Sequence, residues 1–204
     1  FTQLISKSGG NTYHGSFYGD KEFERFQSYN VDAAQIKAGV TGGGGLQARD
    51  TNRMSSYSDK NVDIGGFLLK DKAWWYGSYR ALDSNVRYTN YPVETFKTEL
   101  RNYTGKLTYQ LNQNNKFVAY MQWGAKTQPN RTDSSNKLGA PIHITAASTT
   151  LQDSPSWVYK GEWNGTINQN TFAEFRAGQF GYNFGLDSNT GDRRYESIST
   201  NQVL

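Results

Sequence analysis

The sequence predicts an all-β chain, folded as a partial transmembrane antiparallel up-and-down β-barrel of about seven strands. Three observations predict this class. Aromatic residues make up 15% of the 204 residues, although hydrophobic residues reach only 35%. Short segments alternate apolar and polar residues with the period of a β-strand. The connections between these segments are alternately long and short, as in outer-membrane barrels.

Seven segments carry the alternation. It is clearest in 101–111, where Tyr103 and Tyr109 share one face and Asn102 and Lys106 share the other. Each such segment predicts one strand with its two faces in different surroundings. The expected strands are 13–20, 61–69, 73–82, 101–111, 116–125, 156–164 and 171–181.

The connections alternate in length along the chain. Tight turns are expected at 70–72, 112–115 and 168–170. Longer loops are expected at 21–60, 83–100 and 126–155, and a polar tail from Leu186. Barrels of the outer membrane have short turns on the periplasmic side and long loops outside, so the alternation also predicts an orientation.

The phase of each segment predicts which residues meet lipid and which line a wet interior. Large aromatic residues fall toward the strand ends, as interfacial girdles require, and charged residues fall on the opposite phase. The residues expected to face lipid are Phe17, Trp75, Tyr103, Tyr109, Trp123, Trp157 and Trp163. The residues expected to face the lumen are His14, Asp63, Arg80, Lys106, Lys160, Glu162, Glu174 and Arg176.

Seven strands are an odd number, whereas single-chain bacterial barrels have an even one. Open sheet edges cannot persist in lipid, because their unpaired backbone groups find no water there. We therefore expect these residues to be part of a longer protein.

Composition and motifs argue against several other functions. The net charge of +4 is dispersed, without the basic stripe that nucleic-acid binding needs. There is no cysteine, and His14 and His143 are isolated, so no metal site is expected. No nucleophile–base arrangement is present. We therefore predict no enzyme activity and no cofactor.

Two polar motifs have a simple interpretation as loops. The run Gly42–Gly45 lacks the preceding strand and the following Gly-Lys-Ser/Thr of a phosphate-binding loop. The run 187–192 loosely resembles a calcium loop. However, it has Asp192 where the sixth-position glycine belongs and Ile198 where the twelfth-position acid belongs. We expect both runs to be solvated loops.

The run Leu-Ile-Ser-Lys-Ser-Gly-Gly-Asn-Thr-Tyr-His-Gly-Ser at 4–16 resembles the plug-to-barrel junction of TonB-dependent outer-membrane receptors. It is most similar to the large subgroup with an N-terminal carboxypeptidase-regulatory-like domain. The resemblance implies that 1–11 ends the plug, beginning with a strand-like piece at 4–7, and that 12–204 begins the barrel. The expected junction residues are Ser8, Gly9, Gly10 and Asn11.

The resemblance also implies a function. Such a receptor resides in the bacterial outer membrane, contacts its lipid, and binds a scarce nutrient through its external loops. It imports the nutrient when the TonB complex, reached through the plug, supplies energy. The loops expected to contact the ligand here are 21–60, 83–100 and 126–155.

Two alternatives remain open. One is a barrel that acts as a surface adhesin or scaffold without transport, which would keep its binding in a mutant lacking TonB. The other is a soluble, secreted all-β domain such as a carbohydrate-binding module or a β-structured hydrolase. A soluble domain would bury its largest aromatic residues in a compact core.

Overall fold

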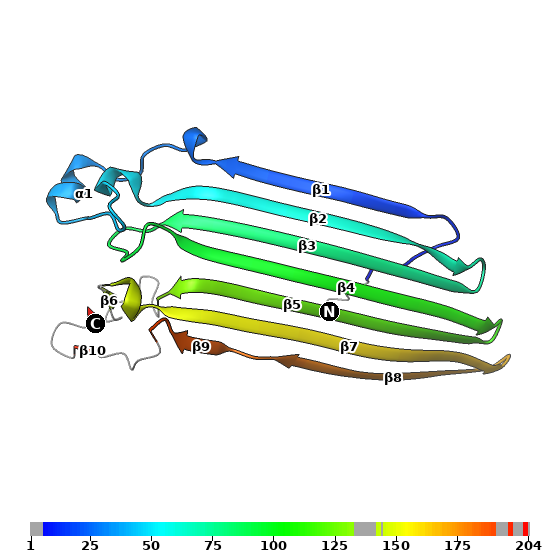
Figure 1. Ribbon diagram of the computed structural model, residues 1–204. Helices are drawn as coiled ribbons and strands as arrows, with labels where there is room; N and C mark the ends of the chain where they lie inside the picture. Colours follow the sequence, from blue (N-terminus) through cyan, green and yellow to red (C-terminus); the bar gives the residue numbers. More distant parts are fainter. Residues whose placement is uncertain (1–5, 133–141, 144, 191–195, 198–201, 204) are drawn as a thin grey trace.

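The computed structural model describes residues 6–132, 142–143, 145–190, 196–197 and 202–203. They form a single-layer antiparallel sheet of eight strands, in the order β1-β2-β3-β4-β5-β7-β8, with β9 pairing beside β7 (Figure 1). The strands are β1 (His14–Phe23), β2 (Arg53–Leu69), β3 (Ala73–Arg87), β4 (Phe96–Asn112), β5 (Asn115–Arg131), β7 (Thr150–Asn168), β8 (Thr171–Tyr182) and β9 (Gly185–Ser188). Among the described strands, β1 forms one edge of the sheet, and β8 together with β9 forms the other.

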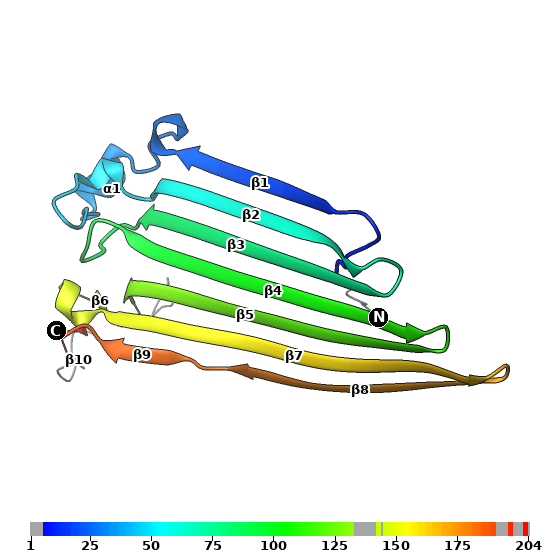
Figure 2. The same ribbon diagram turned by 45° about the vertical axis from the view of Figure 1, so that its right-hand side comes forward.

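The prediction of an all-β, up-and-down antiparallel sheet is confirmed. Six of the seven expected segments lie within a strand, and the seventh, 13–20, lies in β1 except for Tyr13, which precedes it. The tight turns at 70–72, 112–115 and 168–170 lie together at one end of the sheet. The long loops gather at the other end, as both views show (Figures 1 and 2). We call these the turn end and the loop end.

The predicted strand limits are too short at the loop end. Strand β2 begins at Arg53 rather than at 61, and Ser56 and Ser58 pair with Asn85 and Asp83 of β3. These extensions are polar on both faces, so the alternation that marks the central part of each strand disappears there. Backbone pairing continues without it.

Two predictions about segments outside the main strands were wrong. Residues 186–188 were expected to belong to a polar tail, but they lie in β9, which pairs with Thr150–Asp153 of β7. Residues 4–7 were expected to be strand-like. Ser6 and Lys7 are not in a strand, and Leu4 and Ile5 lie outside the described residues.

Short helical turns lie in the loops: η1 (Glu24–Phe26), α1 (Ala33–Lys37), η2 (Ala48–Asp50) and η3 (Ala146–Ser148). The carboxylate of Asp32 caps α1 by accepting a hydrogen bond from the backbone N–H of Gln35, 2.8 Å away. None of the described helices has the length and apolar character needed to cross a membrane. A small second sheet joins β6 (Ile142–His143), β10 (Glu196–Ser197) and β11 (Gln202–Val203).

The sheet has no second layer of secondary structure over either face in the described part of the chain (Figures 1 and 2). The buried apolar side chains among these residues are few: Val31, Ala73, Tyr76 and Tyr91. A sheet normally buries one face against another layer, so the apolar side chains of this one remain available to its surroundings.

Candidate functional site: two unlike faces and the N-terminal segment

The strand registers divide the side chains into two faces of different chemistry. Directly paired residues of an antiparallel sheet lie on the same face, and successive residues alternate. The apolar face carries Phe17, Val62, Trp75, Tyr79, Tyr103, Leu107, Tyr109, Phe117, Met121, Trp123, Trp157, Tyr159, Trp163 and Phe175. The polar face carries His14, Asp63, Arg80, Asn102, Lys106, Gln122, Lys126, Lys160, Glu162, Glu174 and Arg176.

Two rows of aromatic side chains cross the apolar face in register. The loop-side row consists of Tyr79, Tyr103, Trp123 and Trp157, each paired with the next. Their rings are in contact, with centroids 4.8 Å apart for Tyr79–Tyr103 and 5.7 Å apart for Tyr103–Trp123. The turn-side row consists of Tyr109, Phe117, Trp163 and Phe175, again paired in order.

The two rows are separated by six residues on β4, β5 and β7. At about 3.4 Å per residue this is roughly 20 Å along each strand. Between the rows, the described strands β2 to β8 carry no charged residue on the apolar face. Beyond the loop-side row, charges return to the same face, beginning with Lys60, Asp83 and Arg101.

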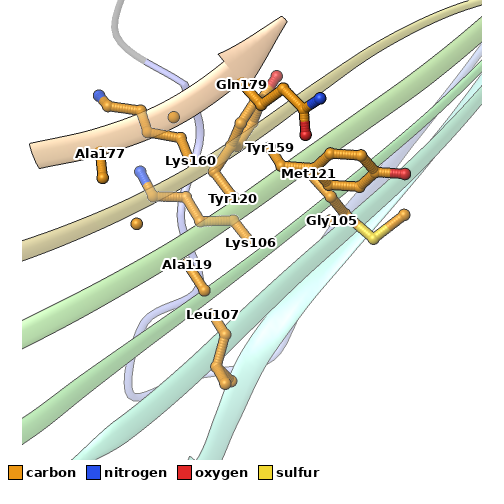
Figure 3. Close-up of a pocket in the computed structure, with 12 residues that line it drawn as sticks. Gly105, Lys106, Leu107, Ala119, Tyr120, Met121, Tyr159, Lys160, Ala177 and Gln179 are labelled. Carbon is orange, nitrogen blue, oxygen red and sulfur yellow. The ribbon is translucent and has the colours of Figure 1, made fainter.

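A shallow trough of about 760 Å³ lies between the rows. Small residues shape it, because Ala119, Gly161 and Ala177 are paired across β5, β7 and β8. Met121 and Tyr159 border the trough. Figure 3 shows the side chains of Lys106 and Lys160 pointing away from those of Met121 and Tyr159. The trough is therefore a depression in the apolar face.

The residues expected to face lipid all lie on this apolar face, and none is buried. Phe17 is 75% exposed and Trp123 is 37% exposed. Trp75, Trp157 and Trp163 are half-buried among neighbours on the same face. Trp74 points to the polar face, because it pairs with Phe67 and Thr108.

The eight residues expected to face the lumen all lie on the polar face, and four of them form ion pairs along the strands. Lys160 pairs with Glu162 on β7, and Arg176 pairs with Glu174 on β8. Glu162 and Arg176 are also directly opposite each other across the two strands. The charges on this side of β7 and β8 are thus mutually compensated.

Two more polar-face residues, Asp63 and Lys106, contact the N-terminal segment, residues 6–11, or the strand that follows it. The ammonium of Lys106 donates to the backbone oxygen of Ser6 at 3.3 Å and to its hydroxyl at 3.1 Å. Lys7 pairs with Asp63 at 3.1 Å, and the same carboxylate accepts a hydrogen bond from Ser16. The segment therefore lies across the polar face near the turn end (Figure 1).

The predicted junction residues have distinct roles within this segment. A side chain at Gly9 would meet the backbone oxygens of Trp75 and Gly66 at 2.2 and 2.4 Å, whereas at Gly10 nothing lies within 4 Å. The Asn11 side-chain oxygen accepts from the Trp74 indole N–H at 2.7 Å and from a backbone N–H of the β2–β3 turn. Ser8 is exposed.

Of the two histidines, His14 lies on the polar face with its Nδ1 3.1 Å from the carbonyl oxygen of Gly65. This contact fixes the start of β1 against β2. The backbone of His143 belongs to β6, and its side chain lies outside the description. Across the described residues, no group of three or more His, Cys, Asp or Glu side chains could hold a metal ion.

Arg80, the last of the eight residues expected to face the lumen, forms a bidentate ion pair with Asp59 on β2. Its Nε and Nη2 donate to the two carboxylate oxygens at 2.9 and 2.5 Å. Asp59 is 4% exposed. The hydrogen bonds from Arg80 hold the pKa of the Asp59 carboxyl below its usual value, despite burial, which raises it.

The first two long loops pack into one structured cap at the loop end. Buried Arg53 donates to the backbone oxygens of Glu24 and Gln27 at 2.9 and 3.1 Å. The guanidinium carbons of Arg49 and Arg53 lie over the ring of Tyr29, 4.2 and 4.4 Å from its centroid. These contacts tie residues 24–52 to the start of β2.

The second part of this cap centres on Tyr91, which contacts Tyr88 and Phe96. Burial raises the pKa of its hydroxyl. A side chain at Gly43 would meet the Tyr91 carbonyl oxygen, so the run 42–45 packs against the neighbouring loop. It is a loop, as expected, but the backbone contact itself requires glycine. Asp187 of the calcium-like run lies in β9, whereas Asp192 and Ile198 lie outside the described residues.

Comparison of the chain with protein-family models, with curated proteins and with solved structures found no match.

Proposed function

We propose that this chain is a wall segment of a TonB-dependent outer-membrane receptor, which binds an external nutrient and imports it across the outer membrane. One observation carries the proposal. Two registered aromatic rows bound an uncharged zone on one face, while the opposite face of the same strands carries ion pairs and the N-terminal segment.

The apolar face supports a lipid environment. A single-layer sheet with exposed aromatic residues needs an apolar medium or a covering layer on that side. From Tyr103 to Leu111, β4 has nine residues, and a transmembrane β-strand needs about 9–11. Aromatic rows at both ends of an uncharged zone are typical of the two membrane interfaces.

The sheet topology supports the orientation and the larger barrel. In outer-membrane barrels the short turns are periplasmic and the long loops external, so the loop end would lie outside the cell. In lipid, the free backbone groups of β1 and β8 would need partner strands. We propose that further strands of a longer protein supply them.

The contacts of the N-terminal segment support a plug-to-wall junction. Asp63 and Lys106 hold this segment by hydrogen bonds and an ion pair at partly exposed positions, which exchange readily with water. Contacts of this kind suit a segment that must separate from the wall when force is applied.

Neighbouring tryptophans offer a sharp test of the membrane assignment. Trp75 lies on the apolar face and Trp74 on the polar face. Two single-tryptophan variants of the full-length protein would each keep one of these residues and replace every other tryptophan by Phe. In vesicles of brominated phospholipid, fluorescence should be strongly quenched for the Trp75 variant and little quenched for the Trp74 variant. Equal quenching would contradict the assignment.

Transport is tested separately in cells. A strain lacking TonB should stop accumulating the nutrient while the receptor still binds it at the surface. Uptake that continues unchanged without TonB would refute the transport proposal. A protein that binds ligand and never supports accumulation in either strain would instead be the adhesin or scaffold.

A further inference from the structure

A second depression lies on the polar face, between the loop-side aromatic level and the cap. It has a volume of about 450 Å³, within the range of small-molecule sites. Three adjacent rows of paired residues cross it. Its central row is Arg80, Asn102, Gly124 and Ser156, which are paired in this order across β3, β4, β5 and β7.

The flanking rows complete this groove. On the loop side, Leu82, Leu100, Lys126 and Ser154 are paired in order. On the turn side, Gln122 contributes from β5. The described part of the N-terminal segment contacts Lys106 and residues still nearer the turn end, none of which lines the groove, so it leaves the groove uncovered.

The floor of the groove is open because residue 124 is glycine. A Cβ there would stand 3.3 Å from both the Asn102 amide nitrogen and the Ser156 hydroxyl oxygen. A larger side chain would fill the space above these polar groups. Gly124 thus keeps several hydrogen-bonding groups accessible from one cavity.

The groove is rich in free donors and poor in free acceptors. The side-chain oxygen of Gln122 accepts from the hydroxyl of Tyr120, and that of Asn102 accepts from Thr104. Their amide N–H groups have no partner among the described contacts, and neither has the hydroxyl of Ser156. A ligand with several acceptor oxygens would satisfy these groups.

The charge of the groove is positive. Arg80 is neutralised by Asp59, but half-buried Lys126 has neither an ion pair nor a hydrogen bond within the described part of the chain. Burial lowers the pKa of the Lys126 ammonium, and the nearby charge of Arg131 lowers it further. A partly desolvated cation without a counter-ion is costly, and a bound anion would relieve that cost.

We propose that this groove binds a small anionic, hydroxyl-bearing ligand, with Lys126 pairing with its carboxylate, phosphate or sulfate group. Asn102, Gln122 and Ser156 would donate to its oxygens, and Leu82 and Leu100 would contact its apolar edge. The inference rests on the proposed receptor function and narrows its substrate class to polar anions. The size of the groove suits a molecule of one or two sugar rings.

The test is calorimetric binding by the purified full-length protein in detergent. The anionic probes are glucuronate, glucose 6-phosphate and glucose 6-sulfate, and glucose is the neutral control. Wild-type protein should bind at least one anionic probe about tenfold or more tightly than glucose, as one charge-assisted hydrogen bond allows. That affinity should fall with added salt.

Three substitutions test whether the probes bind in the groove. Lys126→Gln should remove the preference for the anion, and Gly124→Val should weaken every bound probe. Lys60→Gln removes an equal charge from the opposite face and should change nothing. Equal binding by wild type and Lys126→Gln would overturn the proposal, and so would binding of no anionic probe. Tryptophan quenching in vesicles is independent of these results, so the membrane assignment can stand if the groove proposal falls.

Discussion

Replacing Gly9 by alanine should release the N-terminal segment from the sheet. The new Cβ would lie 2.2 Å from the carbonyl oxygen of Trp75 and 2.4 Å from that of Gly66. Both are backbone atoms within paired strands and cannot move aside cheaply. The segment must therefore lift, and the contacts of Ser6 and Lys7 with the polar face should open with it.

The expected magnitude follows from those contacts. Lys106 donates to Ser6, and such a hydrogen bond contributes about 0.5–1.5 kcal/mol net. The Lys7–Asp63 pair has one largely exposed partner, so about 0.2–1 kcal/mol is appropriate. Together they amount to roughly 0.7–2.5 kcal/mol, which corresponds to an open population about 3- to 70-fold larger.

Trypsin cleavage after Lys7 measures this population, because a protease must draw the chain away from the sheet to cut it. The rate of cleavage after Lys7 should be higher in Gly9→Ala than in the wild type by the factor above. Mass spectrometry of the released peptide measures this rate. Gly10→Ala is the matched control, since nothing lies within 4 Å of a Cβ at that position. If both variants are cut at the wild-type rate, the segment is not held by the described contacts.

Two further perturbations test the faces and the loop-end ion pair. Leu107→Arg on the apolar face should lower the stability of the vesicle-embedded protein by about 2–4 kcal/mol, the cost of arginine near mid-membrane. Thr104→Arg on the polar face of the same strand should cost far less, and equal losses in urea unfolding would count against a lipid-facing surface. The pKa of Asp59 is lower in the folded protein than in the unfolded chain, where it is about 4. Asp59 should therefore stabilise the folded protein above about pH 4. That contribution should be lost as the pH falls through the pKa of the folded state. Asp59→Asn should therefore flatten the acid side of a stability–pH profile, and an unchanged profile would show that the Arg80 pair contributes nothing.

The sequence predicts the strands of this fold well where their two faces differ in polarity. Tyr103 and Lys106 on β4 show the reason, since their opposite phases are visible without any structure. The polar ends of the strands are invisible to the same reasoning, because Ser56 and Ser58 pair as regularly as Val62 but carry no alternating signal. The phase therefore indicates which face a residue occupies and leaves the strand limits open.

The sites are less predictable than the strands, because they depend on register between strands. Asn102 and Ser156 are 54 positions apart in sequence and meet only through Gly124. Lys126 belongs to a predicted loop and would look like ordinary solvated charge. The contact between Gly9 and the β2–β3 hairpin is equally non-local. The neighbouring Gly-Gly pair marks a turn in the sequence, yet only the first glycine is sterically required.

Strand length has a consequence for how this wall would stand in an envelope. Strand β7 has 19 residues, which at about 3.4 Å per residue gives a length near 60 Å. A hydrocarbon layer is about 30 Å thick. Even when tilted by about 40°, such a strand would project well beyond the bilayer. On the proposed orientation, the mouth of the receptor would be a stiff collar raised above the cell surface, and ligands would first meet hydrogen-bonded sheet instead of loosely tethered chain.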